Sequence, residues 1–315
     1  MINLNAGMYI NKSFQMLSII LISIFFFSGC KPKTKTSIQT SDAYLINDFY
    51  QDKDYPAGII ELQVPIPSTD IKIYGFEYTA NGQGPHPTLI MLHGNPGNER
   101  NLDIAQNLRK GGYNVVYFDF RGSWGSKGEF TFENNIADTK ALINYLSDPS
   151  RVEELRIDTN KIALFGHNTG GAIALMAGLE DRRIKGVASL SLFNPYRVIK
   201  SPTGMMNMVS MKEYLSTLGM LNINSDYFLK EMIANVDRYN LEKYIGQSNK
   251  SILVIDEYEA NNYLNRFKKK GNIQYEIWDT DIAFSNKRTA LVRRLKDWLD
   301  QDLHFTEIRK TSYIK

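Results

Sequence analysis

One segment of the chain has the residue pattern of a turn that presents a reactive side chain. Residues Ile162–Gly171 read IALFGHNTGG, in which four apolar residues precede Gly166, a central Asn168 and Gly170. The spacing Gly-x-nucleophile-x-Gly is typical of a sharp strand-to-helix turn where enzymes expose a serine, and in other cases a cysteine or aspartate. The Asn168 amide is no substitute for an alkoxide, a thiolate or a carboxylate. The pattern therefore predicts the turn without its usual nucleophile.

The histidines decide whether another hydroxyl could be activated, because a serine-type nucleophile needs an imidazole to take its proton. The chain has four histidines, His86, His93, His167 and His304. His86 stands in a turn between two prolines, and His167 flanks the Asn168 turn. His304 follows the last predicted helix and would reach a site only if the tail folded back over the domain.

Other kinds of chemistry find little support in the composition. The formal charge is +3 on 315 residues, which is too balanced to indicate a nucleic-acid partner. Lys268–Lys270 precede Gly271 at a predicted helix end, where cations complement the helix dipole. No His, Cys and carboxylate cluster has metal-ligand spacing, and Gly122–Gly125 indicates a turn rather than a phosphate-binding loop. We expect no cofactor and no metal.

Four segments in a fixed order carry a resemblance to a known family. They are LHGNPGNERN (Leu92–Asn101), FDFRGSWGSKGEF (Phe118–Phe130), FGHNTGG (Phe165–Gly171) and WDTDIAFSNKR (Trp278–Arg288). Together they resemble the α/β-hydrolase superfamily, and within it they are most similar to bacterial serine hydrolases of the prolyl-oligopeptidase and serine-aminopeptidase-like groups. The resemblance covers roughly residues 56–303.

The resemblance implies a triad in the order Ser, acid, His, and this chain departs from it twice. Asn168 stands at the first position. The acid would lie in the loop IDEYEANN, where Asp256, Glu257 and Glu259 are available; Glu259 fits the spacing best, and a solvated acidic loop is the alternative. The family's D-x-D-H-A-F turn reads DTDIAF here, so that Ile282 replaces the histidine.

The oxyanion-binding side of the resemblance persists. The expected donors are the backbone N–H groups of Thr169 and of Asn95 or Gly94, whereas Pro96 has none. Thr169 is a conceivable stand-in nucleophile, but no base serves it. Asparagine tolerates the positive φ that such a turn imposes, so Asn168 can keep the turn while lacking the nucleophile. These features predict a site that binds a carbonyl or carboxylate group.

The elements that would position these residues follow from periodicity. Apolar runs of strand length alternate with helical stretches, which predicts an α/β fold with a doubly wound, mostly parallel eight-stranded sheet and an antiparallel start. Residues 194–250 interrupt the alternation where this superfamily inserts a helical lid. Six of the eleven methionines lie there, which suits an apolar surface over a pocket or ordinary core filling: Met205, Met206, Met208, Met211, Met220 and Met232.

The N-terminus has the composition of a targeting segment. Lys12 precedes the apolar stretch Met16–Phe27, which is too short to span a bilayer and suits a signal peptide. Cys30, the only cysteine, follows Phe27-Ser28-Gly29 in a sequence that resembles a bacterial lipobox. We therefore expect a lipoprotein signal over residues 1–30, a flexible tether over 31–55, a domain over 56–303 and a tail over 304–315. An ordinary secretion signal or an uncleaved anchor is the alternative.

These observations lead to competing hypotheses for function. The first is a membrane-anchored, noncatalytic α/β-hydrolase-fold protein of the bacterial cell envelope that binds a small carbonyl- or carboxylate-bearing ligand, a peptide or a protein partner. The second is an active peptidase or carboxylester hydrolase of the envelope that uses another constellation of residues. The third is a remnant that retains only a stable fold.

Overall fold

The computed structural model describes residues 42–305. The chain divides into two units, Met1–Ala43 and Tyr44–Lys315, and the description below concerns the second. The expected signal peptide, its lipidation site Cys30 and residues 306–315 lie outside the described part of the chain.

Eight strands form one sheet in the order β1-β2-β4-β3-β5-β6-β7-β8. β1, β2 and β4 pair antiparallel, and every other neighbouring pair is parallel. The strands are β1 (Gly58–Pro65), β2 (Lys72–Thr79), β3 (His86–Leu92), β4 (Asn114–Asp119), β5 (Ile157–His167), β6 (Ile184–Leu190), β7 (Ser251–Asp256) and β8 (Ile273–Ile277). This sheet confirms the predicted doubly wound, mostly parallel architecture with an antiparallel start.

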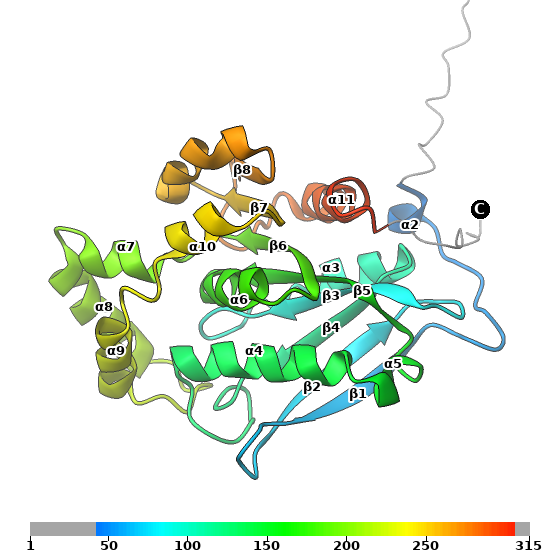
Figure 1. The fold of residues 1–315 in the computed structure, drawn as a ribbon, viewed down its shortest axis with the longest axis horizontal. Coiled ribbons are helices and arrows are strands. Elements are labelled where there is room, and N and C mark those ends of the chain that lie inside the picture. Colours follow the sequence, from blue (N-terminus) through cyan, green and yellow to red (C-terminus); the bar gives the residue numbers. More distant parts are fainter. Residues whose placement is uncertain (1–41, 306–315) are drawn as a thin grey trace, which may run out of the picture. The chain divides into compact units, whose positions relative to one another are not determined.

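Helices cover both faces of the sheet (Figure 1). One face packs against α4, α6 and α10, and the opposite face packs against α3 and α11. The helical segments are α2 (Ala43–Ile46), α3 (Leu102–Lys110), α4 (Phe132–Leu146), α5 (Pro149–Val152), α6 (Thr169–Glu180), α7 (Pro195–Lys200), α8 (Gly204–Ser216), α9 (Ser225–Ala234), α10 (Leu241–Gln247), the 3₁₀ segment η2 (Glu259–Lys270), α11 (Arg288–Asp297) and the π turn η3 (Trp298–Asp302).

The central strands separate two apolar cores because successive side chains point to opposite faces. In β3, Ile90 and Leu92 belong to the core under α4 and α6, whereas Leu89 and Met91 belong to the core under α3 and α11. All seven residues of β3 are buried. A strand buried on both faces is continuous in apolar residues, which is why the sequence of this strand was recognisable.

Part of the predicted tether, residues 31–55, packs against the domain. Tyr44 is 3% exposed and lies in the core under α3 and α11. Farther on, the Arg156 guanidinium donates hydrogen bonds to the carbonyl oxygens of Tyr55, Pro56 and Gly82. The segment from Tyr44 onward is therefore packed against the domain, because its aromatic residue and backbone carbonyls find partners there. In the described part of the chain, no helix is both long and apolar enough to cross a membrane.

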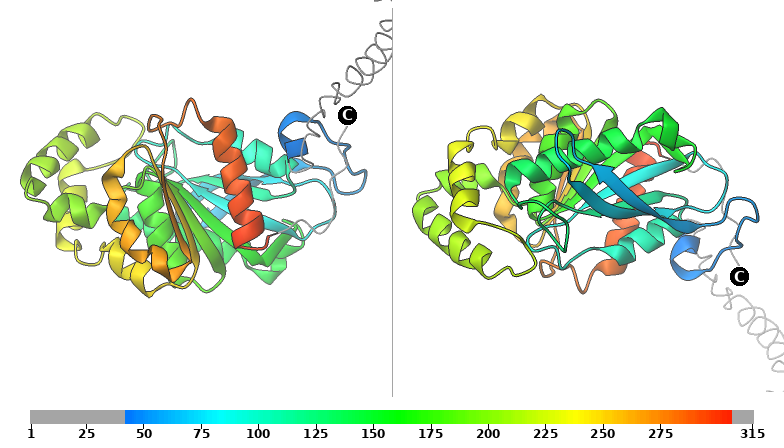
Figure 2. Two further views of the ribbon diagram at one scale, coloured as in Figure 1. Left: turned by 90° about the horizontal axis from the view of Figure 1, so that it is seen from above. Right: turned by 90° about the horizontal axis from the view of Figure 1, so that it is seen from below.

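The segment predicted to form a lid folds into α7, α8, α9 and α10. Figure 2 shows α7–α9 grouped at one end of the sheet. α10 packs beside α6, where Leu241 and Ile245 are fully buried. The methionines divide by position: Met208 and Met232 are buried, Met205, Met206 and Met220 are exposed, and Met211 lines a cavity.

β2 carries one buried carboxyl group, that of Glu77. It is fully buried, and within residues 42–305 neither of its carboxyl oxygens lies within hydrogen-bond geometry of a donor. Burial raises the pKa of Glu77 from its ordinary 4.5 to about 8. Between these two pH values the unfolded chain has released this proton while the folded protein still holds it, so stability falls as pH rises through that window.

We predict that Glu77→Gln removes this pH-dependent loss of stability. Relative to the wild type, the variant should gain about 1.4 kcal/mol for each pH unit between roughly 5 and 8. Urea unfolding at pH 5, 6.5 and 8 measures the difference, with Glu61→Gln, on the exposed face of β1, as the control. A difference between wild type and Glu77→Gln that stays constant with pH contradicts the assignment.

Candidate functional site

The predicted strand-to-helix turn lies between β5 and α6. Asn168 precedes the first residue of α6 with φ 53° and ψ −114°, a conformation that most side chains avoid. Its backbone N–H donates to the carbonyl of Leu190 at 2.8 Å, and its carbonyl accepts from the N–H of Gly171 at 3.0 Å. The side-chain amide donates to the carbonyl of Ser191 at 3.3 Å. Asn168 thus holds the turn and is tied to the end of β6.

Backbone crowding explains the glycines on either side of Asn168. A Cβ atom on Gly166 would lie 2.2 Å from the carbonyl oxygen of Gly170. A Cβ atom on Gly170 would lie 2.4 Å from the carbonyl oxygen of Leu92 and 2.5 Å from that of His93. Only glycine allows the start of α6 to approach β3 so closely.

Ile282 lies in the loop after β8, across the site from Asn168. Its side chain is 52% exposed, and its carbonyl oxygen accepts a hydrogen bond from Nε2 of His167 at 2.9 Å. His167 is buried, and this burial lowers its pKa. The imidazole beside Asn168 therefore uses its Nε2–H to hold the loop that carries Ile282.

None of the other three histidines is placed to act as a base at the Asn168 turn. His93 is buried; its Nδ1–H donates to the carbonyl of Gly94 at 2.8 Å, and burial lowers its pKa to about 4. His86 begins β3, at the end of the sheet opposite the Asn168 turn. His304 precedes Phe305, whose carbonyl accepts from Tyr113 just before β4, so it too lies near the amino ends of the strands.

The acid that reaches the site is Glu257 rather than Glu259. Glu259 is the exposed first residue of η2, so the choice based on spacing is corrected by the structure. Glu257 Oε2 accepts a hydrogen bond from Ser191 Oγ at 2.7 Å. Asp256 is buried and bonded to the N–H of Leu192 and the amide of Asn261, which makes it a structural tie. Burial raises the pKa of Asp256 to about 6.

Ser191 is a site residue that sequence reasoning did not single out. It directly follows β6 and has a φ of 45°, which is uncommon for a residue other than glycine. The apolar pattern extends through IKGVASLSLF (residues 184–193), so Ser191 looked like part of the strand. Pro195, which has no N–H to donate to a sheet ladder, was the one available signal that the strand ends before it.

The loop after β3 carries Gly94 and Asn95, two of the predicted oxyanion donors, and is called the oxyanion loop below. Asn95 and Thr169 line the same cavity, and within residues 42–305 neither backbone N–H has a protein acceptor. The side-chain Oδ1 of Asn95 is buried and also lacks a partner. Tyr214 of α8 donates its hydroxyl to the carbonyl of Asn95 at 2.9 Å, which links the lid to this loop. The predicted donors Gly94, Asn95 and Thr169 therefore gather at one cavity.

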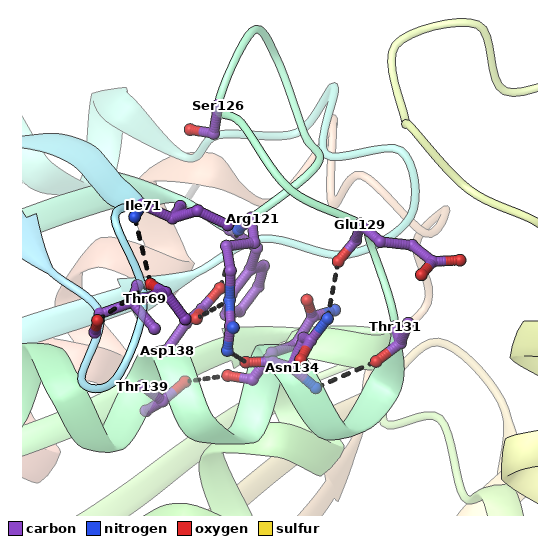
Figure 3. Close-up of polar contacts among 12 residues, drawn as sticks. Thr69, Ile71, Arg121, Ser126, Glu129, Thr131, Asn134, Asp138 and Thr139 are labelled. Atoms are coloured by element: carbon purple, nitrogen blue, oxygen red, sulfur yellow. Dashed lines mark hydrogen bonds and ion pairs between the residues drawn. The ribbon is translucent and has the colours of Figure 1, made fainter.

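The turn after β4, which contains Ser123 and Trp124, packs against the oxyanion loop and holds it in place. Trp124 donates its Nε1–H to the carbonyl of Pro96 at 2.7 Å, and Ser123 Oγ lies 3.2 Å from Nε2 of His93. This turn is itself held by a buried ion pair, in which Nε of Arg121 lies 2.6 Å from Oδ1 of Asp138 (Figure 3). Asp138 also accepts the backbone N–H of Arg121 at 2.8 Å.

Two cavities meet at Asn168 and Ile282. The first, of about 600 Å³, has the oxyanion loop and Thr169 on one side and lid residues on the other: Met211, Tyr214, Leu215 and Phe228. The second, of about 360 Å³, has a more polar lining that includes Ser191, Asn194 and Glu257. Phe193 also belongs to both. Among the described residues, no three His, Cys, Asp or Glu side chains come together in a way that could hold a metal ion.

Known proteins share this fold and parts of this sequence. The chain is 30% identical over 156 residues to an uncharacterized 31.7 kDa protein of the traX-finO intergenic region of Escherichia coli, which covers 49% of this chain and 53% of that protein. It is 27% identical over 134 residues to the quorum-quenching protein AidA of Acinetobacter baumannii, covering 41% and 42%. The chain thus spans about half the length, or less, of these curated relatives.

A solved structure and a family model complete the comparison. The structure of Est1E from Butyrivibrio proteoclasticus with ferulic acid bound superposes with a TM-score of 0.57 at 16% identity, covering 77% of this chain and 99% of that one. This likeness shows the shared α/β-hydrolase fold. The family model BD-FAE matches residues 76–266, which span the loop after β3, the Asn168 turn and the whole lid segment. The chain therefore belongs to the BD-FAE family of esterase-like α/β-hydrolases.

Proposed function

We propose that this protein binds a small carbonyl- or carboxylate-bearing ligand and does not turn it over. The proposal rests on the pairing of Asn168 and Ile282 at the strand-to-helix turn. Asn168 supplies the turn but no nucleophile, and Ile282 occupies the loop where the resemblance expects the base. The imidazole of His167, the one nearest the turn, is already bonded to the carbonyl of Ile282.

The ligand class follows from the lining of the first cavity. The N–H groups of Asn95 and Thr169 are free to donate to a carbonyl or carboxylate oxygen, as in an oxyanion hole. The lid contributes Leu215, Phe228 and Met211, which favour an acyl chain or an aromatic ring. A hydrophobic carboxylate such as ferulic acid, which Est1E binds, combines both features.

We predict that hydrophobic carboxylates raise the melting temperature and that filling the cavity abolishes the effect. Met211→Trp places a larger side chain into the first cavity, whereas Met206→Trp changes an exposed residue of the same helix. A ligand at a hundred times its Kd should add about 2.7 kcal/mol to the stability of the native state. A melting-temperature screen with ferulic and hydrocinnamic acids measures this. Equal shifts in Met211→Trp and wild type would contradict binding in this cavity.

A second candidate function is hydrolysis by another constellation, and Ser191 is the observation that favours it. Its Oγ–H donates to Glu257 at 2.7 Å beside Asn168, and its backbone is held at φ 45°. Strained backbone is frequent at functional sites. In such a reaction Ser191 Oγ would attack an ester carbonyl while its proton passes to the Glu257 carboxylate. The tetrahedral intermediate would then break its bond to the alcohol oxygen, which takes that proton from Glu257, and water would hydrolyse the acyl-Ser191 ester. A carboxylate is a weak base for a hydroxyl at neutral pH, so the first candidate is the better supported.

Ester turnover separates the two candidates. We expect no p-nitrophenyl ester hydrolysis by the wild type, by Asn168→Ser or by Ile282→His. The double variant should gain activity by about a hundredfold or more over background, because it restores nucleophile and base together. Wild-type turnover that is lost in Ser191→Ala, with a fluorophosphonate label on Ser191, would instead establish the second candidate. Ser201→Ala, in the same cavity, is the matched control.

Anchoring to the bacterial cell envelope through Cys30 is part of the proposal. Its support is the lipobox-like sequence and the polar segment after it. We predict that the wild type, expressed in a bacterium, enters the detergent phase on Triton X-114 partition and that Cys30→Ser shifts it toward the aqueous phase. If the wild type incorporates no lipid label at Cys30, this part of the proposal is wrong.

A further inference from the structure

We infer that the second cavity is a subsite for a protonated amine, with the Glu257 carboxylate as its counter-ion. The inference rests on the proposed function, because it concerns the same ligand. The ligand would carry an ammonium group close to its carbonyl group, as a free amino acid amide or the N-terminus of a peptide does.

The first step is the charge balance of the second cavity. Three charged side chains line it, Asp256, Glu257 and Arg197. Arg197 is bound to Glu242 by both Nε, at 2.7 Å, and Nη2, at 2.6 Å, and its guanidinium lies 4.1 Å from the ring centre of Tyr263. Glu242 also pairs with Arg266, so the charge of Arg197 is only partly compensated there. Within residues 42–305 Arg197 forms no ion pair with Asp256 or Glu257, so the lining presents two carboxyl groups and one guanidinium that is engaged elsewhere.

The second step is the state of the two carboxyl groups. Asp256 is buried, and its two oxygens accept from the N–H of Leu192 and the amide of Asn261. Glu257 is only half-buried and forms one hydrogen bond, from Ser191 to Oε2. Within residues 42–305, no lysine, arginine or histidine forms an ion pair with Glu257. Glu257 thus offers Oε1 as a charged acceptor.

The third step is the connection to the carbonyl site. Asn168, Phe193 and Ile282 line both cavities, so one ligand can extend from the first cavity into the second. When its carbonyl group binds Asn95 and Thr169, the part of the ligand beyond Asn168 faces Glu257. A protonated amine on that side donates a charge-assisted hydrogen bond to Oε1. The remaining lining of hydroxyl and amide groups, Ser201, Thr203 and Asn207 among them, keeps this end polar.

The test uses two probes that differ in the amine alone. L-Phenylalaninamide and N-acetyl-L-phenylalaninamide share a benzyl group and a carbonyl, but only the first carries a protonated amine at pH 6, below the ordinary α-amino pKa of about 7.7 to 8.0. Calorimetric titration of the full chain at pH 6 should show tighter binding of the free amine by about tenfold or more, corresponding to one charge-assisted hydrogen bond. High salt should reduce that preference.

Glu257→Gln should remove the preference and leave the affinity for the acetylated probe unchanged. Glutamine keeps an oxygen that can accept from Ser191, so the local structure is retained. Glu259→Gln, on the neighbouring exposed carboxylate, is the matched control and should behave as wild type. Equal affinity for both probes, or a preference that survives Glu257→Gln, overturns the inference while the proposed function stands. Failure of both probes to bind also overturns the inference, whereas the proposed function is decided by the carboxylate screen described above.

Discussion

The contact between the start of α6 and the end of β3 is the constraint on which the site depends. Gly170 lets the start of α6 approach the backbone carbonyl groups of Leu92 and His93, where a Cβ atom would collide with their oxygens. Gly166, at the end of β5, allows the same close approach to the carbonyl group of Gly170. This contact places the N-terminus of α6, and with it the Thr169 N–H, beside the loop that carries Asn95. Interiors are close-packed, so neither partner can shift without the other. The carbonyl site is thus a property of backbone packing and is independent of the side chain at 168.

This independence explains how the turn can carry Asn168 and keep its shape. The turn demands a residue that tolerates positive φ, and asparagine meets the demand at low cost. Its amide also contributes a hydrogen bond to the end of β6 through Ser191. On the opposite side, the backbone carbonyl of Ile282 accepts the His167 proton, so the loop after β8 is held without help from the Ile282 side chain. Stability and catalysis are therefore separable in this fold.

Periodicity predicted the fold well because its strands and helices are buried in regular patterns. α4, for example, spans Phe132–Leu146, where its buried residues recur at helical spacing and the Thr131 side chain caps its N-terminus. The loops were harder to predict. Glu257 and Glu259 are two residues apart in sequence, and the conformation of the loop after β7 leaves Glu257 bonded to Ser191 and Glu259 exposed. Ser191 was missed because strand-like residues continue on both sides of it, and the ladder with β7, not the residue type, determines where the strand ends.

The meeting of two unlike cavities at Asn168 has a further physical consequence. An enzyme gains rate only from contacts that strengthen in the transition state, so tight contacts to both ends of an intact substrate are of little use to it. A protein that only binds is under no such restriction. Under the proposed function, the apolar lid, the N–H groups of Asn95 and Thr169 and the carboxylate of Glu257 all act on the ground state of one ligand. Such a site would gain affinity from each contact and would leave the ligand intact.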